Sequence, residues 1–211
     1  FSDQVIVGDI SIGTGETDAV RFIAKTAREL YRTYPGIHYH LSSGNAQFVM
    51  EQLDKGLIDF GVVFGPVDQT KYNSLEIPFQ DTWGVLMRQD SQLASKKLIS
   101  PQDLWDKPLI ISEQESTQEG LSAWLQKKTG ELEIVATYNL LFNASLMVAE
   151  GLGYAIGFDH IINTSCGSSL CFRPLSPKRE AGLSIIWKKY QIFSRASEKF
   201  MQKIKELMTQ E

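Results

Sequence analysis

The segment Asp9–Asp18 (DISIGTGETD) has the residue types of a small-molecule or anion site. It has the pattern of a short apolar strand that breaks at glycines and small polar residues directly before a helix. Such a turn directs side-chain hydroxyls and the unpaired N–H groups of a helix start toward one point. Thr14, Gly15, Glu16 and Thr17 are therefore the first candidate ligand-binding residues.

Glu16 leaves two chemistries open for this loop. If its carboxylate points into the site, it disfavours carboxylate ligands and favours an amine or a polyol. If it points outward, the hydroxyls and N–H groups suit an anion. Glu16 is also the one side chain that we would assign as an acid or base in an enzyme.

The elements around this loop follow the pattern of a parallel sheet. Val20–Tyr34 carries one continuous apolar stripe, which predicts a helix that Thr14 or Thr17 caps and Pro35 ends. The alternating segment 37–41 predicts a strand, a second helix follows, and the apolar run 57–64 predicts a buried strand. Ligands in parallel sheets sit beyond the carboxyl ends of strands. This rule adds the candidates Ser43, Gly44, Asn45, Gly65 and Pro66.

A second α/β set follows in the middle of the chain. It consists of strands at 109–111, 133–138 and 153–158, with helices at about 118–128 and 144–150. The same edge rule selects Glu113, Ser116, Thr117, Asn139 and Asn143. The charges of Glu113 and Glu115 are otherwise expected to be solvated. We therefore expect two α/β subdomains, the first from residues 1–80 and 179–211 and the second from residues 81–178.

Composition excludes several classes of protein. A net charge of −4 and a pI near 5.5 argue against a broad nucleic-acid surface. The apolar runs are too short to cross a bilayer, and Phe1–Val5 lacks the features of a secretory signal, so a cytoplasmic protein is expected. Cys166 and Cys171 are expected to be reduced thiols, with a redox pair left open. No spacing predicts a metal site, a cofactor or a catalytic group of residues.

Several motifs occur in an order that is typical of one family. They are Gly8–Gly13, Tyr34–Gly36, Gly44-Asn45 with Leu53–Asp59 (LDKGLID), Glu150–Gly157 (EGLGYAIG) and Phe172–Leu175. In this order the sequence resembles the effector-binding (substrate-binding) domain of LysR-type transcriptional regulators. It departs from the commonest pattern after Ile156, where Gly157-Phe-Asp-His160 stands.

The resemblance implies a fold, a ligand and partners. The implied fold has two Rossmann-like subdomains in the type II periplasmic-binding-protein architecture, with a small-molecule effector in the cleft between them. The implied assembly is a homodimer or homotetramer, in which helix Val20–Tyr34 meets helix Gln118–Lys128 of another subunit. DNA would be bound only through an N-terminal helix-turn-helix that is absent from this chain, and no enzymatic activity is expected.

Two alternatives share the expected architecture. One is the solute-binding protein of a transporter. The other is a small enzyme, such as a dehydratase, which would depend on Glu16 for acid/base chemistry.

Overall fold

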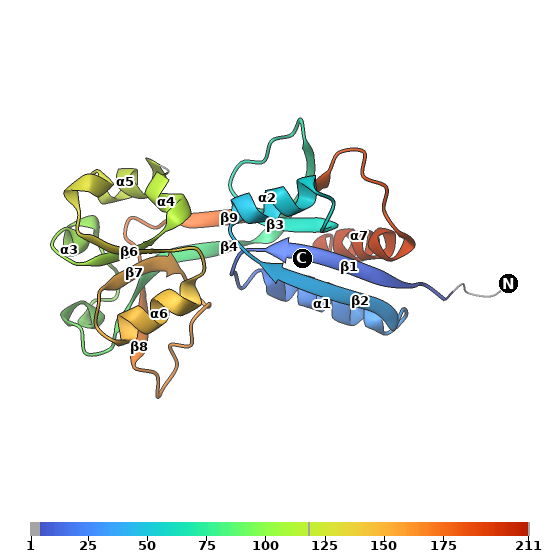
Figure 1. Ribbon diagram of the computed structural model, residues 1–211. Coiled ribbons are helices and arrows are strands. Elements are labelled where there is room, and N and C mark those ends of the chain that lie inside the picture. The colour runs from blue at the N-terminus through green and yellow to red at the C-terminus, as the bar shows by residue number, and fades with distance from the viewer. Residues whose placement is uncertain (1–4, 118, 211) are drawn as a thin grey trace. The chain divides into compact units, whose positions relative to one another are not determined.

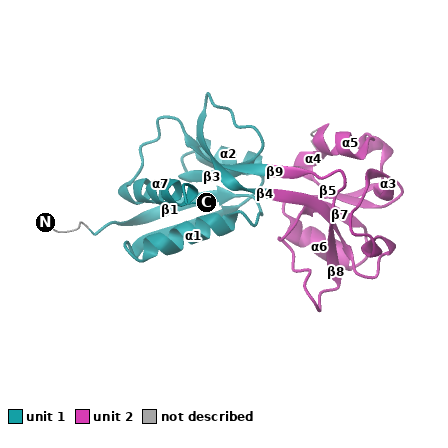
Figure 2. Cartoon of the chain, turned by 180° about the vertical axis from the view of Figure 1, so that it is seen from behind, with its two compact units in different colours: residues 1–80, 182–211 teal, residues 81–181 magenta. Residues whose placement is uncertain are grey.

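The chain divides into two compact units, which Figure 2 shows in different colours. The structure, a computed structural model, describes residues 5–117 and 119–210. Unit 1 contains Phe1–Gln80 and Gly182–Glu211, and unit 2 contains Asp81–Ala181. The chain passes from one unit to the other within two long strands, β4 (Tyr72–Arg88) and β9 (Glu180–Lys188), which are neighbours in the strand order.

Unit 1 is a sheet with helices on both faces (Figure 1). Its strands run in the order β2-β1-β3-β9; β1 pairs in parallel with β2 and β3, and β9 is antiparallel to β3. Its elements, besides the two crossing strands, are β1 (Val7–Thr14), α1 (Val20–Tyr31), β2 (Gly36–Ser43), α2 (Ala46–Asp54), β3 (Phe60–Phe64) and α7 (Arg195–Met208).

The strand period explains how this sheet is covered. Phe60 and Val62 of β3 pack into a cluster with residues of α1 and α7, whereas Val63 packs into a second cluster with α2. Successive side chains of a strand point to opposite faces, so a central parallel strand needs apolar residues throughout. The unbroken apolar run that predicted this strand is therefore confirmed, and it places α1 and α7 on one face and α2 on the other.

Unit 2 has its own sheet, in the order β8-β4-β7-β5-β6. Strand β5 is parallel to β6 and β7, whereas β4 is antiparallel to β7 and β8. Its elements are α3 (Pro101–Leu104), β5 (Leu109–Ser112), α4 (Glu113–Thr117), α5 (Glu119–Leu125), β6 (Ile134–Tyr138), α6 (Leu141–Ala149), β7 (Tyr154–Phe158) and β8 (Leu170–Pro174), with 3₁₀ turns η1 (Gln92–Ser95) and η2 (Thr129–Glu131).

In unit 2, as in unit 1, a central strand has apolar side chains packed on both faces of the sheet. Leu109 and Ile111 of β5 pack on the side of α3 and α5, and Ile110 packs on the side of α6. The short helix α3 begins with Ser100-Pro101, and the Asp103 carboxylate accepts hydrogen bonds from the N–H and hydroxyl of Ser100. Pro at the first helical position and a Ser-Asp capping box are typical of a helix start.

Two helix predictions were wrong in detail. Helix α1 ends at Tyr31 rather than Tyr34, because the residue before Pro35 is disfavoured in the helical region. The helix expected over 118–128 ends earlier, at Leu125, and α4 precedes it; Gln118 lies outside the described residues.

No helix in the described ranges is long and apolar enough to span a bilayer.

The buried Tyr72 hydroxyl gives a test of packing in unit 1. It donates a hydrogen bond to Asp54 Oδ1 at 2.7 Å, and Tyr72 is only 3% exposed. Burial first, and then the bond to Asp54, raises the pKa of Tyr72 from 10.0 to about 12. Tyr72→Phe should lower the free energy of unfolding at pH 7 by about 1–2 kcal/mol. Urea denaturation measures this loss.

The contribution of the Tyr72 hydroxyl to stability falls at high pH. Because the folded-state pKa is the higher one, the contribution is fully present below pH 10 and is lost as the pH rises through about 12. The matched control is Tyr39→Phe at pH 7, since the buried Tyr39 hydroxyl has no hydrogen-bond partner among the described residues and its removal should not destabilise the fold. Equal losses of unfolding free energy in Tyr72→Phe and Tyr39→Phe would contradict a stabilising role of the Tyr72–Asp54 hydrogen bond.

Candidate functional site

In unit 1, the parallel pairing of β1 and β2 brings two predicted loops together. Thr14 at the end of β1 is in register with Ser43 at the end of β2, and the Gly44 N–H donates to the Thr14 carbonyl at 3.0 Å. Gly15 lies within reach of the Gly44 carbonyl oxygen, which would be 3.6 Å from a Cβ at residue 15. The two loops therefore form one continuous polar edge at the carboxyl ends of these strands.

The two helices at this edge begin in different ways. Asn45 caps α2, because its side-chain oxygen accepts the Phe48 N–H at 3.0 Å. Thr17 Oγ1 accepts the Ala19 N–H at 3.0 Å just before α1. The predicted alternative in which Thr14 caps the helix was wrong, because the Thr14 hydroxyl is buried and donates to the Gly15 carbonyl.

The remaining predicted residues of unit 1 differ in exposure. Ser43, Gly65 and Pro66 are exposed, and Glu16 is partly exposed. Gly65 follows β3 with a φ of +77°, a conformation that favours glycine. A Cβ at Gly15 would lie 3.6 Å from the ring of Phe64, so the end of β3 adjoins the same edge.

In unit 2, strands β5 and β6 end side by side. Ser112 is in register with Tyr138, which places the starts of the two following loops at neighbouring positions. Ser112 Oγ accepts the Glu115 N–H, and Asn139 Oδ1 accepts the Leu140 N–H. Ser116 donates to the Glu113 carbonyl and Glu113 is exposed. Asn143 is exposed in the first turn of α6, and the side chain of Thr117 lies outside the described residues.

Glu115 corrects the prediction that both glutamates of this loop are solvated. It is 7% exposed, and its Oε2 pairs with Arg179 Nη2 at 2.9 Å. The Arg179 guanidinium also lies over the Trp83 ring, 4.4 Å from its centroid. A Cβ at Gly120 would approach Arg179 Nη2 to 2.6 Å, so this glycine leaves room for the pair. A buried carboxylate needs such a partner.

The Arg179 backbone belongs to the same group of contacts. Its carbonyl accepts the Trp83 N–H at 2.9 Å, which joins the residue before β9 to strand β4. The Glu115–Arg179 pair therefore ties the predicted ligand loop of unit 2 to the two strands that leave the unit.

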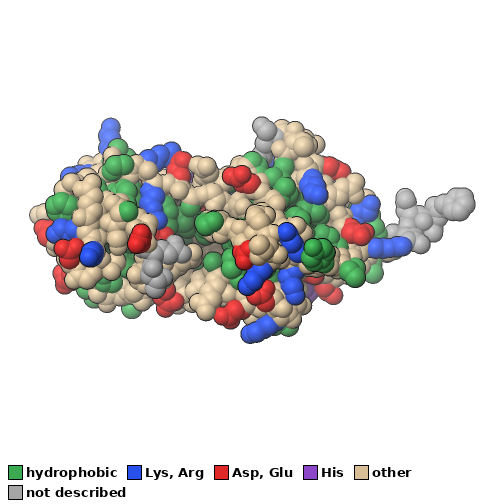
Figure 3. Space-filling model, turned by 90° about the horizontal axis from the view of Figure 1, so that it is seen from above, with side chains coloured by type: hydrophobic (Ala, Val, Ile, Leu, Met, Phe, Trp, Pro, Cys, Tyr) green, Lys and Arg blue, Asp and Glu red, His purple; other side chains and the backbone are tan. Residues whose placement is uncertain are grey.

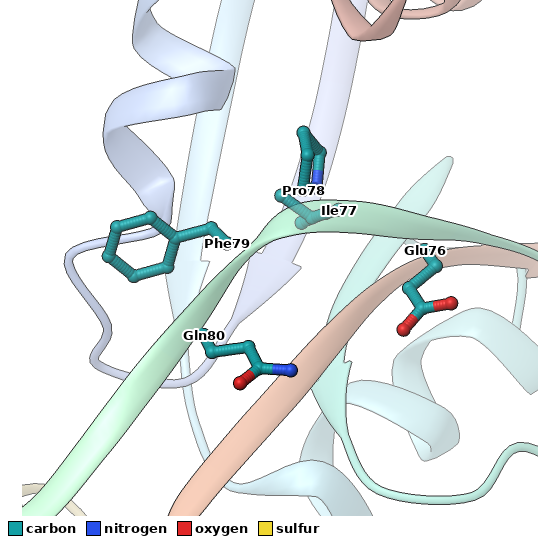
Figure 4. A pocket seen from close by; sticks show the side chains of 5 residues that line it. All are labelled: Glu76, Ile77, Pro78, Phe79 and Gln80. Atoms are coloured by element: carbon teal, nitrogen blue, oxygen red, sulfur yellow. The ribbon is translucent and has the colours of Figure 1, made fainter. Parts of the chain in front are cut away.

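One groove contains residues that the site prediction missed. Glu76, Ile77, Pro78, Phe79 and Gln80 of β4 line a groove of about 430 Å³ in unit 1 (Figure 4). The sequence carried a weak signal for it, because the polar residues Glu76 and Gln80 are four positions apart, which places them on one face of a strand.

Neither cysteine is in a disulfide. Cys166 is exposed, and Cys171 is buried in β8, where burial raises the pKa of its thiol. Across residues 5–117 and 119–210, no group of three His, Cys, Asp or Glu side chains is arranged to hold a metal ion. The face in Figure 3 has acidic and basic side chains interspersed, without the broad basic area that nucleic-acid binding requires.

The buried pair in unit 2 predicts a stability effect. Glu115→Ala leaves the Arg179 guanidinium without its carboxylate, next to a buried Nη1 that already has no acceptor. We expect the free energy of unfolding to fall by about 2–3 kcal/mol, less than the roughly 3–5 kcal/mol of a fully buried pair, because Arg179 is partly exposed. Chemical denaturation measures the loss.

Glu113→Ala is the matched control, because Glu113 is exposed on the same helix. Its effect should stay within about 0.5 kcal/mol. A loss in Glu115→Ala no larger than that of the control would show that the pair contributes nothing.

Comparison of sequences identifies relatives of known class. The family model of the LysR substrate binding domain matches residues 3–209. The uncharacterized HTH-type transcriptional regulator YvbU of Bacillus subtilis (strain 168) is 30% identical over 150 residues, which are 71% of this chain and 50% of that protein. YfeR of Shigella flexneri, of the same description, is 26% identical over 198 residues, 92% of this chain and 63% of that protein. The chain thus spans between half and two thirds of these relatives' length.

Solved structures share the fold. The effector binding domain of QuiR in complex with shikimate has a TM-score of 0.82 at 15% identity, over 97% of this chain and 99% of that one. HinK, a LysR family regulator from Pseudomonas aeruginosa, has a TM-score of 0.77 at 19% identity, over 97% and 72%. The CcmR regulatory domain of Synechocystis PCC6803, in complex with 2-PG, has a TM-score of 0.75 at 17% identity, over 95% and 97%.

These likenesses confirm the expected α/β fold of the periplasmic-binding-protein type II architecture. The family match sets aside the transporter protein and the enzyme that the sequence alone left open. The chain belongs to the LysR substrate-binding domain family, the effector-binding part of LysR-type transcriptional regulators.

Proposed function

We propose that this chain binds a small metabolite through the polar loops at the strand ends of its two units, in the cleft expected between the subdomains. The observation that carries this proposal is the register of β1 and β2, which makes Thr14, Gly15, Ser43, Gly44 and Asn45 neighbours on one edge. Backbone N–H groups and hydroxyls gathered at such an edge suit a polar ligand.

The loops of unit 2 supply the second part of the proposed site. Helix α4, directly after β5, carries Glu113 and Ser116, the loop after β6 carries Asn139, and the two strands end in register. Relatives of the same fold support a metabolite as the ligand, since QuiR was solved with shikimate and CcmR with 2-PG. Thr17, Gly65, Pro66, Thr117 and Asn143 remain proposed members of the site.

We further propose that binding changes how the full-length protein engages DNA. The two curated relatives are named HTH-type transcriptional regulators and are longer than this chain. The ligand would act through a difference in its affinity for two arrangements of the regulator. A protein with this role works in the cytoplasm, which is the location that we propose.

Ser43 gives a direct test of the proposed site. It is exposed at the end of β2, so Ser43→Ala should leave the melting temperature unchanged. A thermal-shift screen of shikimate, 2-PG, amino acids, polyamines and sugars should find a ligand, because a compound at 100 times its Kd stabilises by about 2.7 kcal/mol. Titration calorimetry should then show a Kd about five- to tenfold higher for Ser43→Ala, the cost of one hydrogen bond.

Ser169→Ala is the control, since Ser169 is exposed in the loop before β8. Its Kd should equal that of the unmodified protein. Two results would contradict the proposed site. One is failure of every compound to bind. The other is a ligand that binds Ser43→Ala, Ser169→Ala and Gly44→Ala with equal affinity.

We also propose that a second copy of the chain covers the outer face of α6. Phe142, Leu146 and Met147 on this helix are 59%, 54% and 46% exposed. The contact expected from the sequence, helix Val20–Tyr34 against helix Gln118–Lys128 of another subunit, remains a proposal beside this one. Contiguous exposed apolar side chains on one helix are typical of a protein–protein surface.

Sedimentation at about 50 µM should therefore show a dimer or tetramer, since mass action favours assembly at that concentration. Phe142→Ser combined with Leu146→Ser should shift it to a monomer, because the substitutions remove apolar area from the interface. Leu98→Ser, at a residue 52% exposed in another element, should not change the mass. A monomeric unmodified protein would refute this assembly.

A further inference from the structure

The polar face of β4 in unit 1 presents a carboxylate and an amide to the same groove. Side chains alternate along a strand, so Glu76 and Gln80 share one face. Figure 4 shows both projecting from the same side of β4, whereas Phe79 projects from the other. The groove that residues 76–80 line has a volume of about 430 Å³, enough for a small metabolite.

The groove adjoins the polar edge already proposed as the ligand site of unit 1. A Cβ at Gly182 would lie 3.9 Å from Glu76 Oε1, so Glu76 lies beside Gly182. The next residue, Leu183 of β9, is in register with Phe64 at the end of β3. The Phe64 ring in turn approaches Gly15. A chain of neighbouring residues therefore runs along one edge, from the Gly15 loop to Glu76.

Gly182 lies beside the Glu76 carboxylate and adds no side chain next to it. Glu76 and Gln80 are exposed, and neither makes a hydrogen bond or ion pair within the described part of the chain. Both groups are therefore available to a ligand without the loss of an existing contact.

The lining of the groove contains one charged side chain, the Glu76 carboxylate, and no Lys, Arg or His. A carboxylate can only accept hydrogen bonds, so its natural partner is a donor with positive charge. An anion placed here would instead meet repulsion, with no cationic side chain of the lining to offset it.

We infer that the effector carries a positively charged nitrogen, as an ammonium or guanidinium group, which pairs with the Glu76 carboxylate while the Gln80 amide binds a neighbouring polar atom. This inference rests on the proposed function and specifies the chemical class of its ligand. It differs from the anionic ligands named for QuiR and CcmR, which share only the fold with this chain.

The test compares charged and uncharged forms of the same ligand. Titration calorimetry at low salt is run on the whole chain with lysine, arginine, putrescine and agmatine, with their N-acetylated counterparts where these exist, and with shikimate and 2-PG. At least one cationic compound should bind, and acetylation of its amine should weaken binding tenfold or more.

The variant Glu76→Gln should raise the Kd of that compound at least tenfold and should remove most of its salt dependence. Glu133→Gln, at an exposed glutamate of unit 2, is the matched control and should bind as the unmodified protein does. Melting temperatures of both variants should equal that of the unmodified chain, because neither side chain makes a stabilising contact. Gln80→Glu, which adds a second carboxylate, should tighten binding of the cation.

Two results would overturn the inference while leaving the proposed function intact. One is a ligand that is anionic or neutral and binds equally to Glu76→Gln, yet is weakened by Ser43→Ala. The other is a cationic ligand whose Kd does not change in Glu76→Gln. Failure of all compounds to bind, in this series and in the wider screen, would instead count against the proposed function on which the inference rests.

Discussion

The parallel pairing of β1 with β2 is the constraint on which the polar edge of unit 1 depends. Parallel strands end at the same side of a sheet, so the register of Thr14 with Ser43 forces the two following loops to be neighbours. In the same register the side chains of Ile10 and Ile12 point into the core. A shift of one residue would expose these isoleucines, and packing therefore fixes the geometry of the polar loops.

Glycines then determine how close the backbone segments at that edge come to one another. A Cβ at Gly44 would overlap the Phe48 ring, which packs against this loop where Asn45 starts α2. At Gly182 the missing side chain leaves space beside Glu76. The site that we propose is thus formed as much by absent side chains as by the hydroxyls and carboxylates that surround them.

The two units differ in how a carboxylate near the proposed site is partnered. In unit 2 the buried Glu115 is neutralised by Arg179, whose guanidinium is further held over Trp83. A pair of this kind orders the loop without presenting net charge to a ligand. In unit 1 the exposed carboxylate of Glu76 pairs with no cationic side chain of the described residues and lines a groove. The ligand preference that we infer follows from this contrast between a buried, paired carboxylate and an exposed one without a cationic partner.

The sequence by itself determined the family, the element types and most of the candidate loops. The stripe of α1 and the unbroken apolar run of β3 show which residues of each element are buried, and the spacing of apolar residues within one segment is enough to predict this. Only the tertiary structure decided the burial of Glu115, because its partner Arg179 lies 64 residues away. The same holds for the surroundings of Glu76, whose neighbour Gly182 lies on another strand. Pairing between distant segments is set by how whole elements pack, and no spacing within one segment encodes it.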